Sequence, residues 1–275
     1  MAVKTAVLYI SLGRYDVFFE GFYKSAVKNL LTGHEKHFFV FTDSESVKKA
    51  GYKNVTVIFQ KKLGWPLDTL MRFEMFSSIK KELAGFDYIY FFNSNMEFLK
   101  PVSEEILPGD GHGGLAASIF FIKSPDEYTY DRNPLCRAYI PFGKGKTYYQ
   151  GGLNGGRAKD YLAMISALKD MVDADLKENQ IAVCHDESYL NKYLLDKSPL
   201  ILERNYIYPE QWNPDDCPGE MKIKLRDKDN PVYGGASWLR GATDKKMTVL
   251  KALINHPIKV IKNIIKRRNW WKFIS

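Results

Sequence analysis

The run AVLYI at residues 6–10 is the first of four similar segments, and their arrangement along the chain determines the architecture that the sequence predicts. The later segments are HFFVFT at 37–42, VTVIF at 55–59 and YIYFF at 88–92. β-Branched and aromatic residues dominate all four, as in strands that are buried on both faces. The intervening segments expected to be helical are 17–31, 44–50 and 68–84. This alternation predicts βαβ units, and therefore an α/β domain with a mostly parallel central sheet.

In sheets of this kind, ligands bind beyond the carboxyl ends of the strands. The residues at those positions are Ser11–Tyr15, Thr42-Asp43 and Asn93–Asn95. We therefore expect a binding site at this edge. Neither GxGxxG nor GxxxxGK[ST] occurs in the chain, so no dinucleotide or P-loop site is predicted.

The second half of the chain is less regular. Helices are expected at 157–172 and 187–196, and GGLNGG at 151–156 is interpreted as a turn in which the backbone approaches a ligand closely. The remaining loops are expected at Gly109–Gly114, Tyr128–Pro134 and Pro141–Lys146.

Positive charge is concentrated in the segment 245–275. The chain has 40 Lys and Arg against 32 Asp and Glu; nine of the basic residues and none of the acidic ones fall in this segment, so the remaining 31 basic residues nearly balance the 32 acidic ones. Isoleucines recur at helical spacing between lysines there, and Trp270-Trp271 follow. Such a pattern is typical of a basic amphipathic helix on an anionic membrane. We predict this peripheral role for 245–275, separate from a domain at 1–244; a helix docked on the domain and a nucleic-acid-binding segment are the alternatives.

Cysteine usage indicates a reducing compartment, and hydropathy indicates neither a membrane span nor a signal peptide. Cys136, Cys184 and Cys217 are odd in number, far apart and form no CxxC pair, which argues against a disulfide framework or a zinc ribbon. No apolar run reaches the ~18–20 residues that span a bilayer. The short apolar run Met1–Ile10 is not followed by a cleavage region. We expect a cytoplasmic protein.

Three short motifs have both a structural and a functional interpretation. HDES at 185–188 precedes a helix, where acids complement the helix dipole or carry chemistry. NSN at 93–95 and the glycine-rich segment are either ordinary turns or parts of a ligand site. The wider set that contains them comprises FVFTD at 39–43, LGWP at 63–66, TLMRF at 69–73, FNSNMEF at 92–98, YTYDR at 128–132, AYIP at 138–141, YYQGG at 148–152, HDES at 185–188 and NKY at 191–193.

With these motifs in this order over residues 5–240, the chain resembles glycosyltransferase family 6, the group that contains the histo-blood-group A and B transferases and the α-1,3-galactosyltransferase. The NSN motif is similar to that of the family's bacterial branch, and the tail beyond 245 has no counterpart. The resemblance implies a GT-A fold, a single Rossmann-like domain that takes a sugar from a nucleotide-sugar donor with retention of anomeric configuration. The positions that match donor-contacting residues are Ile10, Leu12, Tyr15, Arg72, Asn93, Asn95, Gln150, Gly151, Gly152, Asp186, Lys228 and Arg240.

The resemblance also bears on metal and catalysis. Many family members have DxD at the positions of Asn93 and Asn95, and the two carboxylates hold Mn²⁺ or Mg²⁺ on the diphosphate. Neutral amides lack that charge, so we expect no metal and no other cofactor, with Lys228 and Arg240 stabilising the leaving UDP instead. Glu187 matches the catalytic glutamate, either as a nucleophile or as a stabiliser of oxocarbenium charge.

Donor and acceptor follow from the same comparison. A small residue at Gly152 favours an N-acetyl group and thus UDP-GalNAc, although the polar Gln150 lines the same pocket and UDP-Gal is the alternative donor. The residues expected at the acceptor are Thr129, Cys184, His185 and Glu210. Ala117 and Cys184 stand where the family has His and Trp, so the acceptor is expected to differ from the Fucα1-2Gal unit.

The sequence therefore predicts a metal-independent, retaining α-1,3-glycosyltransferase that moves GalNAc to a galactoside-type oligosaccharide or glycolipid. It is expected at the cytoplasmic face of a bacterial cell membrane, held there by 245–275, with no nucleic-acid partner. A non-catalytic glycan- or nucleotide-binding relative is the alternative.

Overall fold

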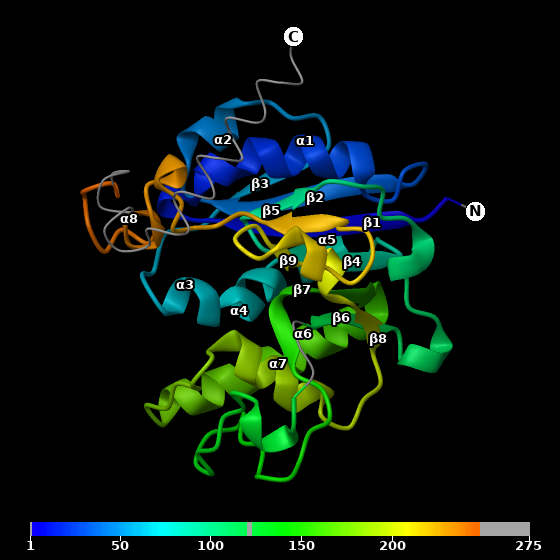
Figure 1. The fold of residues 1–275 in the computed structure, drawn as a ribbon, viewed down its shortest axis with the longest axis vertical. Helices are drawn as coiled ribbons and strands as arrows, with labels where there is room; N and C mark the ends of the chain where they lie inside the picture. Colours follow the sequence, from blue (N-terminus) through cyan, green and yellow to red (C-terminus); the bar gives the residue numbers. More distant parts are fainter. Residues whose placement is uncertain (1, 120–122, 248–275) are drawn as a thin grey trace.

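The computed structural model describes residues 2–119 and 123–247, which form ten strands and eight α-helices (Figure 1). The strands are β1 (Lys4–Ser11), β2 (Glu35–Thr42), β3 (Val55–Phe59), β4 (Tyr88–Phe92), β5 (Met96–Phe98), β6 (Leu115–Ile119), β7 (Tyr149–Arg157), β8 (Leu200–Leu202), β9 (Tyr208–Pro209) and β10 (Ile223–Leu225). The helices are α1 (Phe19–Asn29), α2 (Glu45–Lys49), α3 (Leu67–Leu70), α4 (Arg72–Ser77), α5 (Lys80–Leu83), α6 (Ala158–Lys177), α7 (Asp186–Leu194) and α8 (Ala236–Leu239).

The main sheet of the described residues has seven strands in the order β3-β2-β1-β4-β7-β6-β8. The pairs β2–β3, β1–β2, β1–β4 and β6–β8 are parallel, whereas β7 is antiparallel to β4 and to β6. The four predicted strands are the first four strands observed. The fold is thus a mixed α/β fold with a largely parallel central sheet, compatible with GT-A.

The prediction of a turn at 151–156 is wrong, because these residues lie inside β7. Gly155 pairs with Tyr90 on β4 and with Ala116 on β6. A Cβ atom on Gly155 would meet the Tyr90 ring and would lie 2.6 Å from the Ile89 carbonyl oxygen. Glycine is needed here because the bulky side chain on the neighbouring strand leaves no room for another side chain. In the sequence, a glycine required by such packing cannot be distinguished from a glycine required by a turn.

Helices cover both faces of the main sheet (Figure 1). On β1, Val7 and Tyr9 face a core shared with α1, while Ala6 and Leu8 face a core shared with α4, α6 and α7. Burial on both faces explains why the strand is continuously apolar. The second sheet, β5-β10-β9, packs beside α1 through Met96, Phe98 and Ile223.

The expected helices differ from the observed ones mainly in continuity. The segment 68–84 is divided into α3, α4 and α5, and 17–31 contains α1 preceded by a 3₁₀ helix at Gly13–Phe18. The helix expected at 157–172 is α6, which extends to Lys177.

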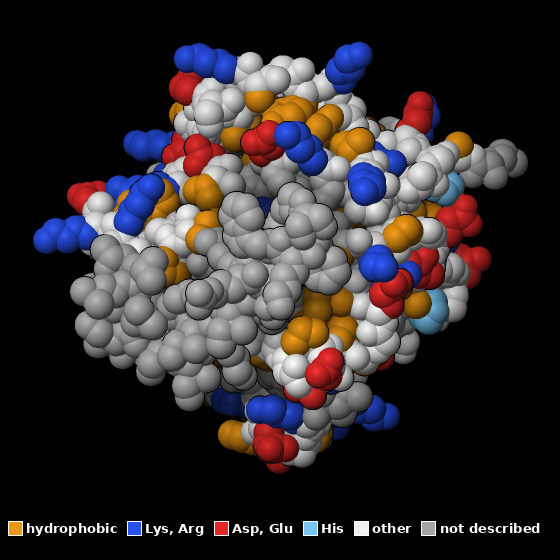
Figure 2. Space-filling view, turned by 45° about the horizontal axis from the view of Figure 1, so that its top comes forward, with side chains coloured by type: hydrophobic (Ala, Val, Ile, Leu, Met, Phe, Trp, Pro, Cys, Tyr) orange, Lys and Arg blue, Asp and Glu red, His pale blue; other side chains and the backbone are white. Residues whose placement is uncertain are grey.

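The predicted membrane helix lies in residues 248–275, outside the described part of the chain. Residues up to Met247 contact the domain: the Met247 N–H donates to the Gly234 carbonyl oxygen at 2.8 Å, and Arg14 Nη2 pairs with Asp244 at 2.7 Å. On the face shown in Figure 2, basic and acidic side chains are interspersed over the described residues. Among the helices that the structure describes, none combines the length and apolar character needed to cross a bilayer.

Candidate active site

A cavity of about 760 Å³ opens where β1 and β4 end and β7 begins, at the edge of the sheet where a ligand was expected. Most of the predicted residues line it. These are Ile10, Leu12, Tyr15, Arg72, Asn93, Asn95, Gln150, Gly151, Gly152, Cys184, His185, Asp186, Glu187, Lys228 and Arg240. Thr129 and Glu210 do not line the cavity.

Glu187 lies in the first turn of α7, half-buried and with both carboxylate oxygens bonded. Oε1 accepts from the Tyr148 hydroxyl and Oε2 from the Gly151 N–H, each at 2.6 Å. Burial raises the pKa of Glu187, while these two hydrogen bonds and the charge of Arg72 act in the opposite direction. His185, just before the helix, has φ 52°, a conformation that is costly outside glycine and is concentrated at functional sites.

Asp186 forms a buried ion pair with Arg72 of α4, at 3.0 Å between Oδ2 and Nη1. The same Nη1 donates to the Gly151 carbonyl oxygen at 2.7 Å, and the guanidinium stacks 4.4 Å from the centroid of Phe91. Burial raises the pKa of Asp186 to about 7, against the opposing charge of Arg72. Arg72 lines the cavity, and its Nε is buried without a hydrogen-bond partner among the described residues.

Amides and cations occupy the part of the cavity where a DxD motif would hold a metal. Asn95 Nδ2 donates to the Arg226 carbonyl oxygen at 2.7 Å, and Asn93 Oδ1 accepts from the Ser94 N–H at 3.1 Å. Hard dications prefer charged oxygen ligands. Within residues 2–119 and 123–247, no group of three His, Cys, Asp or Glu is placed to hold a metal ion. The side chains of Asn93 and Asn95 supply no carboxylate, the ligand that Mn²⁺ and Mg²⁺ prefer.

Lys228 and Arg240 approach the same cavity from the segment that follows β10. Lys228 Nζ lies 5.2 Å from the centroid of the Tyr15 ring, and the Arg240 guanidinium carbon lies 4.3 Å from that of Trp65. Burial, together with the charges of Arg240 and Arg72, lowers the pKa of Lys228 to about 8. This clustering of cations is suited to a polyanionic group.

Gln150 takes up the room beside Gly152. Its Oε1 accepts from the Gly152 N–H. A Cβ atom at residue 152 would lie 2.8 Å from Gln150 Oε1 and 3.0 Å from Nε2. The space expected from a glycine at this position is thus filled by an amide side chain that can rotate.

The predicted acceptor residues are only partly brought together. Cys184 and His185 line the cavity, and Cys184 Sγ lies 3.7 Å from the backbone oxygen of the exposed Thr129. Glu210 instead accepts from the Asp227 N–H at 3.0 Å, beside the second sheet.

Sequence reasoning missed several residues of the site. Tyr148 bonds Glu187, while Trp65, Trp212 and Lys62 line the cavity. Tyr148 and Trp65 belong to quoted motifs, but nothing in the spacing of those motifs shows which side chain meets Glu187.

The fold and the site define an α/β protein with carboxylates and cations around one cavity at the sheet edge, and comparison with known proteins identifies its family. The model of glycosyltransferase family 6 matches residues 2–232, and the chain belongs to this family, as its motifs indicated. It is a hexosyltransferase, and its substrates are a nucleotide-sugar donor and a glycan acceptor.

The relatives include bacterial and mammalian enzymes. The O-antigen biosynthesis glycosyltransferase WbnI of Escherichia coli is 35% identical over 234 residues, which cover 83% of this chain and 97% of WbnI. The histo-blood group ABO system transferase 1 of Rattus norvegicus is 31% identical over 212 residues, 73% of this chain and 60% of that enzyme. The globoside alpha-1,3-N-acetylgalactosaminyltransferase 1 of Mus musculus is 25% identical over 245 residues, 85% of this chain and 67% of that enzyme.

Proposed function

We propose that the protein is a retaining, metal-independent α-1,3-glycosyltransferase that moves GalNAc from UDP-GalNAc to a galactoside-type oligosaccharide or glycolipid. The observation that carries this proposal is the position of Glu187, held by Tyr148 and Gly151 in a cavity that also presents Lys228 and Arg240. The names of the relatives, an O-antigen glycosyltransferase and an α-1,3-N-acetylgalactosaminyltransferase, support the same substrate classes.

In the proposed reaction the uridine lies at Tyr15 and the diphosphate faces Lys228 and Arg240. The bond between the anomeric carbon and the phosphate oxygen breaks, and the two cations stabilise the charge that remains on UDP. The Glu187 carboxylate either attacks the anomeric carbon or stabilises its positive charge while the acceptor attacks from the departing face. In the first route the acceptor oxygen then displaces Glu187 from the glycosyl-enzyme and restores the free carboxylate. In both routes the acceptor hydroxyl gives its proton to a phosphate oxygen of the departed UDP as the new bond forms.

The anomeric proton of the product tests the stereochemistry. Wild-type enzyme is incubated with each of UDP-GalNAc and UDP-Gal and a set of galactoside acceptors, and the product is examined by proton NMR. A new α-linkage at the 3-position is expected. A β-linkage would contradict retention, and no transfer from either donor would contradict the proposed donors.

The position of Gln150 is the observation that favours UDP-Gal as the alternative donor. Its amide lies against Gly152, the position at which the resemblance to the family places the N-acetyl group. We expect Gln150→Ala to raise the ratio of kcat/KM for UDP-GalNAc over UDP-Gal by roughly tenfold, because the pocket gains volume. Gln150→Leu, which keeps the volume, is the control and is expected to leave the ratio at its wild-type value. An unchanged ratio in the alanine variant would show that residue 150 does not select the donor.

We further propose that 245–275 holds the enzyme at the cytoplasmic face of the cell membrane. The support is its nine basic residues, its isoleucine periodicity and its tryptophan pair. The full chain is expected to sediment with vesicles that contain anionic lipid and to stay in the supernatant with neutral ones. Deletion of 248–275 is expected to abolish sedimentation while transfer to a soluble acceptor persists. Sedimentation that survives the deletion would contradict a tail-mediated attachment.

A further inference from the structure

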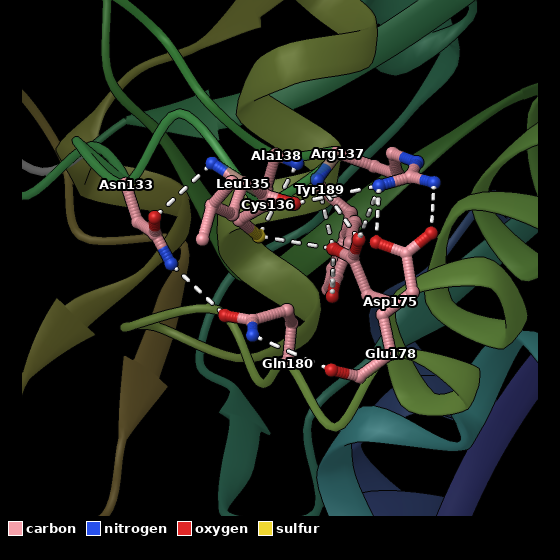
Figure 3. Close-up of polar contacts among 9 residues, drawn as sticks. All are labelled: Asn133, Leu135, Cys136, Arg137, Ala138, Asp175, Glu178, Gln180 and Tyr189. Carbon is pink, nitrogen blue, oxygen red and sulfur yellow. Dashed lines mark hydrogen bonds and ion pairs between the residues drawn. The ribbon is translucent and has the colours of Figure 1, made fainter.

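A buried carboxylate outside the cavity connects three segments of the chain (Figure 3). Asp175 lies near the end of α6 and is 0% exposed. Its Oδ2 accepts from the Tyr189 hydroxyl at 2.8 Å and from the Cys136 thiol at 3.0 Å. The Arg137 N–H lies 3.0 Å from Oδ1 and 2.9 Å from Oδ2. One carboxylate therefore joins α6 to the loop at 136–137 and to α7.

The environment of this carboxylate indicates a role in specifying geometry. The exposed guanidinium of Arg137 is 3.7 Å from Oδ1 and also pairs with Glu178 at the surface. Burying a charged group is costly unless its hydrogen bonds are satisfied, and such groups do not generally add to the free energy of folding over an apolar core. A buried hydrogen-bond network whose members are all bonded instead holds the segments that it joins in a single arrangement.

Tyr189 connects this network to the reacting centre. It is fully buried on α7, two residues after Glu187. Asn191 anchors the same helix to β7, accepting from the Tyr149 N–H at 2.8 Å and donating to the Tyr149 carbonyl oxygen at 2.7 Å. With Asn191 bound to the sheet and Tyr189 bound to α6, the helix has two separate anchors, and its rotation about its own axis is fixed.

The loop before α7 is attached to the same 131–137 segment. The buried Asp131 accepts from the Val183 N–H at 2.9 Å, and Asn133 Nδ2 donates to Gln180 Oε1 at 3.0 Å. Val183 and Cys184 then line the cavity. The loop that leads into α7 thus depends on a segment that Asp175 holds through the Arg137 N–H, while α7 itself is bonded to Asp175 through Tyr189.

We propose that Asp175 is a positioning residue for the transfer reaction: through Tyr189 it fixes α7 so that Glu187 meets Gly151 and Tyr148. This inference rests on the proposed catalytic role of Glu187. The uridine and diphosphate residues, Tyr15, Lys228 and Arg240, lie on other elements. Loss of the carboxylate should therefore change the rate of sugar transfer without changing the affinity for UDP.

The test measures kcat per UDP-binding site, with the site concentration and the Kd for UDP obtained by calorimetric titration. Asp175→Asn and Tyr189→Phe are compared with Glu178→Gln, an exposed carboxylate of the same neighbourhood whose change should have no effect. We expect kcat per site to fall by about 10- to 100-fold in Asp175→Asn, because small displacements of a reacting group have effects of that size. Tyr189→Phe should lower kcat in the same direction, and the Kd for UDP should be unchanged in both variants.

A merely structural role has a different signature. If Asp175 only supported folding, the Asp175→Asn preparation would contain fewer UDP-binding sites, and each remaining site would have the wild-type kcat. That result would overturn the inference. If Asp175→Asn binds no UDP, Tyr189→Phe decides, since it removes a single hydroxyl. An inactive wild type would count against the proposed donors, whereas an active wild type with unchanged variants would count against Asp175 alone.

Discussion

Replacing Glu187 by Gln is expected to lower kcat by about 10³-fold or more. Gln keeps the size of the side chain and one oxygen, so the hydrogen bond from either Gly151 or Tyr148 can persist. In the proposed reaction it removes the negative charge that faces the anomeric carbon. A neutral amide neither attacks that carbon efficiently nor stabilises the positive charge that develops on it.

The kinetic form of the loss is as informative as its size. The Kd for UDP should be unchanged, because the nucleotide contacts proposed for Tyr15, Lys228 and Arg240 do not involve α7. Single-turnover transfer with saturating donor and acceptor separates chemistry from binding. Glu178→Gln makes the same chemical change at an exposed carboxylate and is expected to retain wild-type kcat. Undiminished transfer by Glu187→Gln would remove Glu187 from the mechanism.

Replacing Lys228 by Ala is expected to lower kcat by about 10²- to 10³-fold, because the charge on the leaving UDP then has one cation fewer. Lys224→Ala is a matched control: that lysine pairs with Glu97 at 3.0 Å and does not line the cavity. Wild-type kcat in Lys228→Ala would show that the diphosphate is stabilised elsewhere.

The pH dependence provides a second test of Lys228. Its pKa is lowered to about 8, so the ammonium is charged below that pH and neutral above it. The value of kcat/KM, which reports on the free enzyme, is therefore expected to fall as the pH rises through about 8. In Lys228→Arg the charge persists, so this alkaline fall should move to higher pH. An alkaline fall that stays in place in the arginine variant would assign it to another group.

The sequence predicts the parts of the fold that local periodicity encodes. β3 has the predicted bounds, and β1, β2 and β4 extend or match the predicted runs, because each is a continuous apolar segment. The edge at which the cavity lies follows from the strand order of parallel units. Most of the predicted donor residues belong to the ordered motifs, and the structure brings them to one cavity.

Contacts between segments that are distant in the sequence could not be predicted from local periodicity or from motifs. The segment 151–156 was misinterpreted because the need for glycine comes from other parts of the chain: Gly155 lies against Tyr90 of β4, and Gly156 lies against the Gly114 backbone. Tyr148 and Glu187, which share a hydrogen bond, are 39 positions apart in the sequence. Asp175 is 14 positions from Tyr189 and 39 from Cys136, whose side chains both donate to it. Thr129 and Glu210 are the two predicted acceptor residues that do not line the cavity. Both lie in irregular segments, where a matching motif does not show in which direction a side chain points.

The role of the neutral site at 93–95 is tested by the rate of UDP release from UDP-GalNAc with a galactoside acceptor, after treatment of all solutions with a chelating resin. With EDTA present, the rate is expected to equal the rate in Mn²⁺, because Lys228 and Arg240 take the place of the dication. A rate that disappears in EDTA and returns on addition of Mn²⁺ would contradict cation stabilisation by these two side chains.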